Sequence, residues 1–177
     1  MLNENNKNLY EISPLTMAVI PEDNETGAIN TIILEESGQY SVPSSPTRLI
    51  DLACRYFGSS LQGRLDGTKD VSRITHKAPI AIDPSSGMFF FPTTSPKNRK
   101  CSWINHSHVD HIKPIGSKKT KIVFNNEQNI VVDISYGSMM NQLQRTAQFR
   151  FSLEHRMNQI RQDMEKDMPQ HSSTVKY

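Results

Sequence analysis

The chain has 177 residues, of which 36% are hydrophobic and 21% charged, and its formal net charge at pH 7 is +2. This composition predicts a folded domain and excludes a disordered chain, which would have fewer apolar residues and a larger net charge. No apolar run approaches the roughly 18 residues of a membrane-spanning helix, and the amino terminus lacks the pattern of a secretory signal, so we expect a cytoplasmic protein.

Two strands and a helix are predicted in the first third of the chain. The apolar runs at residues 15–20 and 29–34 have the borders and the β-branched residues of strands. Ser45 and Pro46 are a helix N-cap and a first-turn proline, and the apolar residues after them recur at helical spacing. We therefore expect a short helix near residues 46–57.

The segment from Gly58 to Lys77 is predicted to be a basic connection rich in loops. Glycine in a helix interior costs about 1 kcal/mol relative to alanine, and the glycines at positions 58, 63 and 67 leave room for about one helical turn. Because loops on a rigid scaffold commonly carry function, we expect a functional surface here first.

The middle of the chain is predicted to be mostly β, and its end a long helix. Strands are expected at residues 80–82, 88–91, 101–109, 121–124 and 129–134. No Gly or Pro occurs from Ser138 until Pro169, which predicts a helix of many turns. The predicted fold class is α+β, with one domain over residues 1–168 and a disordered tail over residues 169–177.

The apolar residues of the predicted C-terminal helix form two stripes on nearly opposite faces. One stripe holds Met140, Leu143, Ala147 and Phe151, and the other holds Phe149, Leu153, Met157, Ile160 and Met164. One helix cannot bury both stripes against a single core, so either it kinks near Arg150 or its second half packs on another chain. We favour a homo-oligomer, a dimer or a tetramer, with Leu153, Met157, Ile160 and Met164 at the interface.

The small net charge conceals a basic middle segment. Residues 1–47 have a net charge of −6, and residues 122–177 are balanced. Residues 48–121 hold thirteen Lys and Arg against five Asp and Glu, a net charge of +8. This segment is a candidate surface for a polyanion such as nucleic acid, although solvated loops are the alternative explanation.

The segment His106-Ser107-His108-Val109-Asp110-His111 resembles the metal-binding signature of the metallo-β-lactamase superfamily. At the end of a strand, alternate residues would place His106 and His108 on one side, and Asp110 and His111 could hold a second ion that activates water. That superfamily needs further ligands on a longer chain, and only 66 residues follow His111. A metal-dependent hydrolase is therefore the alternative function. The two cysteines, Cys54 and Cys101, are too few for a zinc site and are expected to be buried thiols.

Several short motifs occur in one order between residues 15 and 150. They are AVIPE at residues 18–22, CRYFGSS at 54–60, ITHKAPI at 74–80, FFFPT at 89–93, CSWI at 101–104, ISY at 134–136 and RTA at 145–147. In this order they resemble the ComK family, the competence transcription factors of Bacillus and related Gram-positive bacteria. Residues 152–177 do not match the segment through which the best-known member meets a proteolytic adaptor, so the resemblance does not extend to that partner.

The resemblance implies a DNA-binding activator of the genes for DNA uptake, with no enzymatic reaction and no cofactor. It implies recognition of A-rich and T-rich boxes in double-stranded DNA, largely from the minor groove, by a homo-oligomer, with RNA polymerase as a further candidate partner. The first candidates for DNA contact lie in or beside the matched motifs: Arg55, Arg64, Lys69, Arg73 and Lys77. The further candidates for phosphate contact are Lys97, Arg99, Lys100, Lys118 and Lys119.

Overall fold

The computed structural model describes residues 12–22 and 27–167, and it confirms the predicted α+β class. Six antiparallel strands form one sheet in the order β3 (Gly38–Val42), β2 (Asn30–Glu35), β1 (Thr16–Glu22), β6 (Trp103–Asn105), β5 (Met88–Pro92) and β4 (Ile80–Asp83). A second antiparallel sheet has the order β7 (Val109–Ile115), β8 (Lys119–Phe124) and β9 (Asn129–Val132). The tail predicted over residues 169–177 lies outside the described residues.

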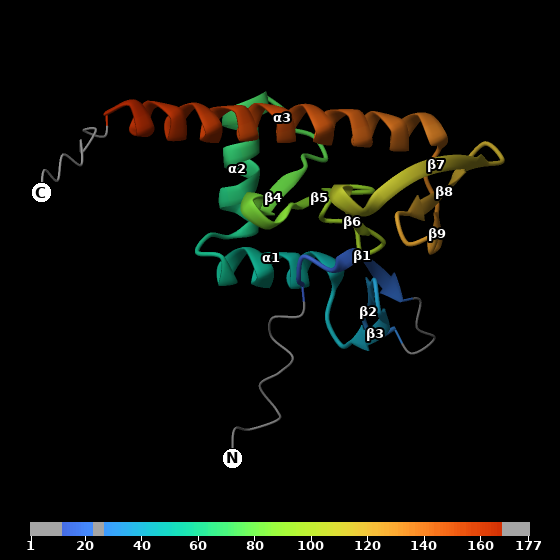
Figure 1. Ribbon diagram of the computed structural model, residues 1–177. Helices are drawn as coiled ribbons and strands as arrows, with labels where there is room; N and C mark the ends of the chain where they lie inside the picture. Colours follow the sequence, from blue (N-terminus) through green and yellow to red (C-terminus); the bar gives the residue numbers. More distant parts are fainter. Residues whose placement is uncertain (1–11, 23–26, 168–177) are drawn as a thin grey trace, which may run out of the picture.

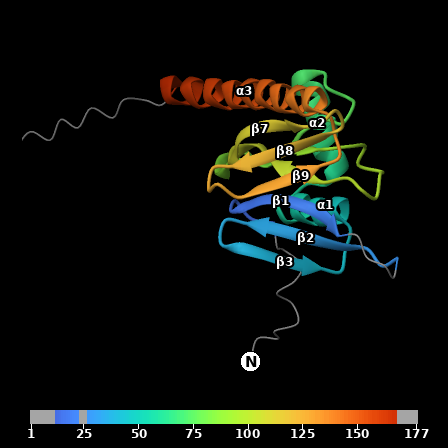
Figure 2. The ribbon, with the colours of Figure 1, turned by 90° about the vertical axis from the view of Figure 1, so that its right-hand side faces the viewer.

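Three α-helices surround the sheets: α1 (Pro46–Tyr56), α2 (Leu61–Ser72) and α3 (Tyr136–Asp167). Figure 1 shows α2 standing between α1 and α3, and α3 continuing past α2 and away from the sheets. In Figure 2 the three-stranded sheet lies between α3 and the strands β1 to β3. Two short 3-10 helices, η2 (Pro84–Ser86) and η3 (His106–His108), complete the elements of the residues that the structure describes. Within the described ranges, no helix is both long and apolar enough to cross a membrane.

In the six-stranded sheet, β1, β6, β5 and β4 are buried on both faces along most of their length. Alternate residues of a strand point to opposite faces, and every residue of β5 is buried. Met88 and Phe90 pack with residues of α1 in one apolar cluster. Phe91 belongs to a second cluster with residues of the three-stranded sheet, and Phe89 packs against Phe149 of α3. A strand covered on both sides needs a continuous apolar run, as the sequence of β5 has.

Helix α1 confirms the short helix predicted near residues 46–57. The Ser45 side chain accepts a hydrogen bond from the Arg48 backbone N–H, and Pro46 occupies the first turn. Thr47 connects α1 to two other parts of the chain. Its hydroxyl donates to the Pro96 carbonyl at 3.0 Å and accepts from the Trp103 indole N–H at 3.1 Å.

The loop predicted over residues 58–77 is wrong for residues 61–72, which form α2. The Ser60 hydroxyl caps the helix by accepting from the Gly63 N–H at 3.0 Å. Thr68 is fully buried, and its hydroxyl donates to the Pro79 carbonyl at 2.6 Å. Packing against β4 and α3 therefore compensates for the low helix propensity of the glycines, which a local reading of the sequence could not show.

The strand predictions need correction at three places. The strand predicted over residues 101–109 is reduced to β6, because the Asn105 side chain accepts from the Ser107 N–H and begins η3. Strands β3 and β7 were not predicted, and their only buried residues are Val42 and Ile112. An exposed edge strand has no apolar alternation by which to recognise it.

Helix α3 confirms the long helix, and Figure 1 shows it without a kink. Its buried positions are Met139, Gln142, Thr146 and Phe149. The predicted stripe through Ala147 and Phe151 is wrong at these two residues, since Ala147 is exposed and Phe151 is 72% exposed. The buried stripe was missed because two of its members are polar. The Gln142 amide donates to the carbonyls of Lys77 and Pro92, at 3.0 and 2.8 Å.

Replacing Gln142 with Leu is expected to lower the free energy of unfolding by about 1–3 kcal/mol, because two carbonyls would lose their buried donor. Chemical denaturation followed by circular dichroism measures the loss. Gln144 is exposed on the same helix, so Gln144→Leu is a matched control that should stay within about 0.5 kcal/mol of the parent. Equal losses in the two variants would contradict the role assigned to Gln142.

Candidate nucleic-acid interface

The structure distributes the predicted DNA-contacting residues over four places. Arg55, Arg64, Lys69 and Arg73 lie on α1, on α2 and at the end of α2. Lys97, Arg99 and Lys100 lie between β5 and β6, while Lys118 and Lys119 lie at the turn between β7 and β8. Lys77 is partly buried in the segment before β4, where its carbonyl accepts from Gln142. The ten candidates therefore do not form one continuous patch.

Two of the candidates on the first two helices make bonds within the protein. Arg55 donates to the Asp51 carboxylate at 2.8 Å, and this hydrogen bond raises the pKa of Arg55. The other oxygen of Asp51 accepts from the Leu61 N–H at 2.8 Å, at the start of α2. Arg64 donates to the carbonyl of Phe57, just beyond the end of α1. Arg55 and Arg64 thus help to fix the turn between α1 and α2.

Lys69 and Arg73 are exposed at the end of α2. Arg73 has the left-handed conformation, with φ of 61°, and its backbone N–H donates to the Lys69 carbonyl at 2.8 Å. This bond satisfies a carbonyl in the last turn of the helix. Neither side chain has an ion-pair partner among the residues that the structure describes. Both remain candidates for an external anion.

Residues 94–100 form a loop between β5 and β6 that we call the basic loop. Its three bases, Lys97, Arg99 and Lys100, are exposed, and the loop contains no acidic residue. Asn98 organises it, because its backbone N–H donates to the Ser95 carbonyl at 2.8 Å and its side chain accepts from the Lys100 N–H at 2.9 Å. Asn and Ser side chains commonly close turns in this way.

Hydrogen bonds from neighbouring parts of the protein also hold the basic loop in place. At its base, the Thr93 N–H donates to the Ser102 carbonyl at 2.9 Å, and the Ser102 N–H donates to the Thr93 hydroxyl at 3.0 Å. The Pro96 carbonyl accepts from Thr47 of α1, which in turn accepts from the buried Trp103. These bonds connect the loop to the core of the protein, so its bases project from a fixed backbone.

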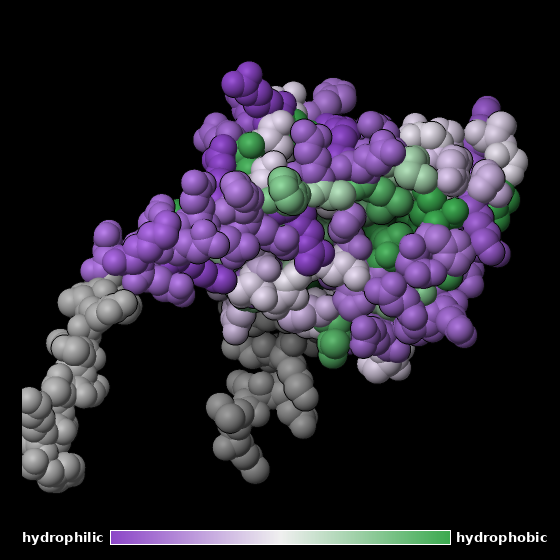
Figure 3. All heavy atoms as spheres, turned by 45° about the horizontal axis from the view of Figure 1, so that its top comes forward, coloured by the Kyte–Doolittle hydropathy of each residue, from purple (hydrophilic) through white to green (hydrophobic). Residues whose placement is uncertain are grey.

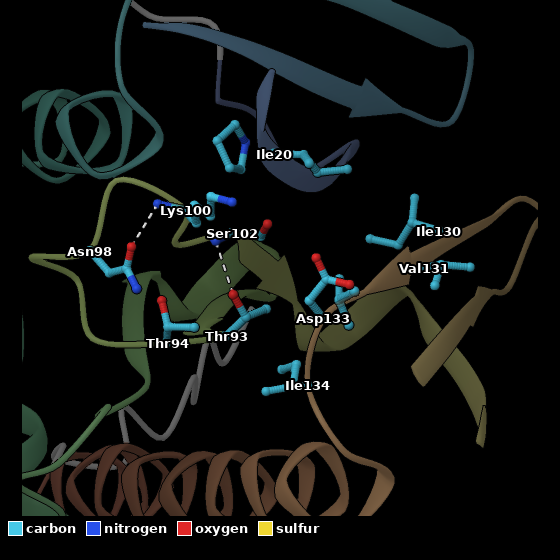
Figure 4. A pocket seen from close by; sticks show the side chains of 12 residues that line it. Ile20, Thr93, Thr94, Asn98, Lys100, Ser102, Ile130, Val131, Asp133 and Ile134 are labelled. Carbon is cyan, nitrogen blue, oxygen red and sulfur yellow. Dashed lines mark hydrogen bonds between the residues drawn. The ribbon is translucent and has the colours of Figure 1, made fainter. Parts of the chain in front are cut away.

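A hollow lies on each side of the basic loop. The first, of about 360 Å³, lies toward β9 and is lined by Asn98 and Lys100 of the loop and by Asp133, as Figure 4 shows. The second, of about 570 Å³, lies between α1, α2 and the loop, and both Lys97 and Arg48 line it. Arg48 was not among the predicted candidates, because no local pattern indicates its proximity to a residue 49 positions away.

The β7–β8 turn places a further base beside Asp133, which lines the first hollow. The Lys119 ammonium lies 3.5 Å from the carboxylate of Asp133, and both side chains are exposed. Lys118 is exposed at the same turn. An exposed ion pair of this kind contributes little to stability, on the order of 0–1 kcal/mol.

The histidine motif does not assemble as predicted. His106 and His108 lie in η3, so the expected strand that would place them on one side is wrong. His108 contacts the Pro14 carbonyl at 2.7 Å and Glu36 at 3.3 Å, whereas His111 contacts Asp110 at 2.6 Å. In residues 12–22 and 27–167, no three His, Cys, Asp or Glu side chains gather into a group that could hold a metal ion. Burial, followed by the charge of Arg150, lowers the pKa of His106.

The two cysteines are buried free thiols, as the sequence predicted. Burial raises the pKa of the Cys54 thiol to about 12, and this effect outweighs the opposing charge of Arg64. Burial also raises the pKa of Cys101. Because the thiolate is the reactive form of cysteine, both side chains are unreactive parts of the core.

Comparison with known proteins agrees with the resemblance seen in the sequence. Residues 7–158 match the model of the family described as ComK protein. The chain is 40% identical over 149 residues to the protein named "Competence transcription factor" of Bacillus subtilis (strain 168), and the matched region covers 84% of this chain and 77% of that relative. No solved structure matches the chain. Since the family model spans most of the sequence and the relative is 40% identical over 84% of the chain, this chain belongs to the ComK family.

Proposed function

We propose that this chain is a transcription factor that binds double-stranded DNA and activates competence genes, acting in the cytoplasm together with RNA polymerase. Its similarity to the competence transcription factor of Bacillus subtilis carries the proposal. The exposed bases of the basic loop support it, because a protein that binds DNA must present positive charge to the phosphates.

We further propose that the DNA target is an AT-rich box contacted largely from the minor groove. Runs of A and T narrow this groove and strengthen its negative potential, which attracts inserted Arg and Lys side chains. Such readout depends on groove shape and charge more than on hydrogen bonds to individual bases. A short exposed loop with three bases and no acid suits this mode of binding.

The end of α3 supports a homo-oligomer. Leu153 packs partly against Phe149 and its neighbours within the same chain, and Met157 is partly buried. Beyond them, Ile160 is 62% and Met164 is 61% exposed. At about 100° per residue, these four side chains continue the stripe that α3 buries against the sheets. On the face drawn in Figure 3, this end of the helix shows mostly hydrophilic side chains, so the exposed apolar pair is a candidate contact for another chain.

A second copy of the same helix would cover Ile160 and Met164. If two helices pair in antiparallel orientation around Ile160, the apolar stripe of one copy meets the same stripe of the other. A two-fold interface uses the same patch on both subunits in this way. We therefore propose Met157, Ile160 and Met164 as the centre of the interface, with Leu153 at its margin.

The first prediction of the proposal concerns DNA preference. The purified protein is expected to bind a labelled duplex with A-rich and T-rich boxes at least about tenfold more tightly than a GC-rich duplex of equal length, a difference of about 1.4 kcal/mol. A fluorescence anisotropy titration measures both affinities. The affinity should fall linearly with salt on logarithmic axes, because the bound phosphates release counterions.

The same titration is repeated with added zinc and with EDTA. We expect identical curves, because the proposed contacts are made by Lys and Arg side chains. Equal affinity for the two duplexes would contradict the AT-box proposal. No binding to either duplex would contradict DNA binding itself.

The second prediction concerns self-association. Ile160→Glu is expected to weaken self-association by about tenfold or more, since the two-fold pairing would place two carboxylates near each other in an apolar contact. Analytical ultracentrifugation measures the change. Ile160 is exposed, so the melting temperature of the domain should remain that of the parent.

Gln159→Glu is the matched control, because it adds the same charge about 100° away around the helix. The control should associate like the parent. A parent protein that stays monomeric at all concentrations, or a control that dissociates equally, would contradict the proposed interface.

A further inference from the structure

We propose that the basic loop is a preformed ridge that enters the minor groove through Arg99, while the hollows on its two sides face the two sugar-phosphate strands that border the groove. In this arrangement Lys100 contacts one strand, and Lys97 with Arg48 contacts the other. The inference rests on the proposed DNA binding and adds the surface that performs it.

The first support is the order of the bases along the loop. Lys97 lines the hollow beside α1, and Lys100 lines the hollow beside β9. Arg99 belongs to the lining of neither hollow, and it reaches toward the Gly27 carbonyl through a long contact of 3.5 Å. The two lysines therefore face opposite flanks of the ridge. A groove in DNA presents the matching pattern, with a negative central channel between two rows of phosphates.

The second support is the charge of the hollows. Each contains an acidic residue that would repel a phosphate, but each acid has its own basic partner. Asp51 accepts from Arg55 and from the Leu61 N–H, and Asp133 pairs with Lys119. The charges left without an ion-pair partner among the described residues are those of Arg48, Lys97 and Lys100, and all three are positive. The hollows are therefore suited to an anion.

The third support is the rigidity of the ridge. Its turns are closed by the backbone and side chain of Asn98, its base is closed by Thr93 and Ser102, and its Pro96 carbonyl is fixed by Thr47. A loop that is ordered before binding loses less conformational entropy when it enters a groove. This property separates the basic loop from an ordinary solvated turn that happens to be basic.

The other basic region offers less free charge. Arg55 and Arg64 are engaged with Asp51 and with the Phe57 carbonyl, which leaves Lys69 and Arg73 at the far end of α2. We therefore place the main DNA contact on the basic loop. This ranking distinguishes the inference from a general attraction between DNA and any positive surface.

A triple variant tests the assignment. Lys97→Gln, Arg99→Gln and Lys100→Gln together remove three exposed charges from the loop without removing any side chain that closes its turns. Affinity for the AT-rich duplex should fall by more than about tenfold, and the slope of log affinity against log salt should decrease in magnitude by about 2 to 3. The melting temperature should stay near that of the parent.

The matched control combines Lys69→Gln, Arg73→Gln and Lys113→Gln, three exposed bases at the end of α2 and on β7 that lie outside the basic loop and the lining of its hollows, and it changes the net charge by the same amount. We expect it to lose less than about threefold in affinity. If the control weakens binding as much as the loop variant does, or the loop variant binds like the parent, the inference is overturned. If the parent binds neither duplex, the proposed function fails instead.

A single variant tests the role of Arg99. Arg99→Lys keeps the charge but replaces the weakly hydrated guanidinium, which enters a narrow groove more readily than an ammonium group. We expect the ratio of AT-rich to GC-rich affinity to fall by about threefold or more, while the salt slope stays the same. An unchanged ratio would overturn the placement of Arg99 in the groove.

Discussion

The burial of both faces of β1, β6, β5 and β4 in the six-stranded sheet is the constraint from which the rest of the structure follows. In β5 every side chain is buried, and each large apolar side chain taken out of water contributes about 1.5–3 kcal/mol. A single layer could cover only one face of these strands. The chain therefore needs α1 on one side and the three-stranded sheet with α3 on the other, and Figure 2 shows the second of these layers. Helix α2 contacts β4, α1 and α3.

Covering the sheet in this way leaves backbone groups inside the protein that need partners. Gln142 satisfies the carbonyls of Lys77 and Pro92, and Thr68 satisfies that of Pro79. The Thr47 hydroxyl accepts a hydrogen bond from the Trp103 indole N–H and donates one to the carbonyl of Pro96 in the basic loop. The hydrogen bonds that satisfy buried groups therefore also hold a surface loop in place. A substitution that disturbs the packing around Trp103 is expected to change the positions of the basic side chains in that loop.

The sequence predicted those elements whose signals are local. The N-cap at Ser45, the apolar run of β5 and the long stretch without Gly or Pro before Asp167 each identify an element by themselves. Helix α2 could not be predicted, because its glycines oppose a helix and only its contacts with β4 and α3 support one. The buried face of α3 was missed for a related reason, since hydrogen bonds allow Gln142 and Thr146 to occupy core positions.

For the candidate site, the sequence predicted which basic residues are candidates for DNA contact, but it did not predict how they are arranged in space. Nothing local shows that Arg55 and Arg64 make bonds inside the protein, or that Arg48 shares a hollow with Lys97. These relations depend on how distant segments pack.

The length of α3 has a consequence for the spacing of DNA sites. A helix of 32 residues is about 48 Å long and, unlike a flexible linker, resists bending. If two copies join through the ends of this helix, the distance and the rotation between their DNA-contacting surfaces are fixed. Two boxes on one duplex would then have to lie on the same side of the double helix, because inserting half a helical turn between them, about 5 base pairs, would rotate one box to the opposite side.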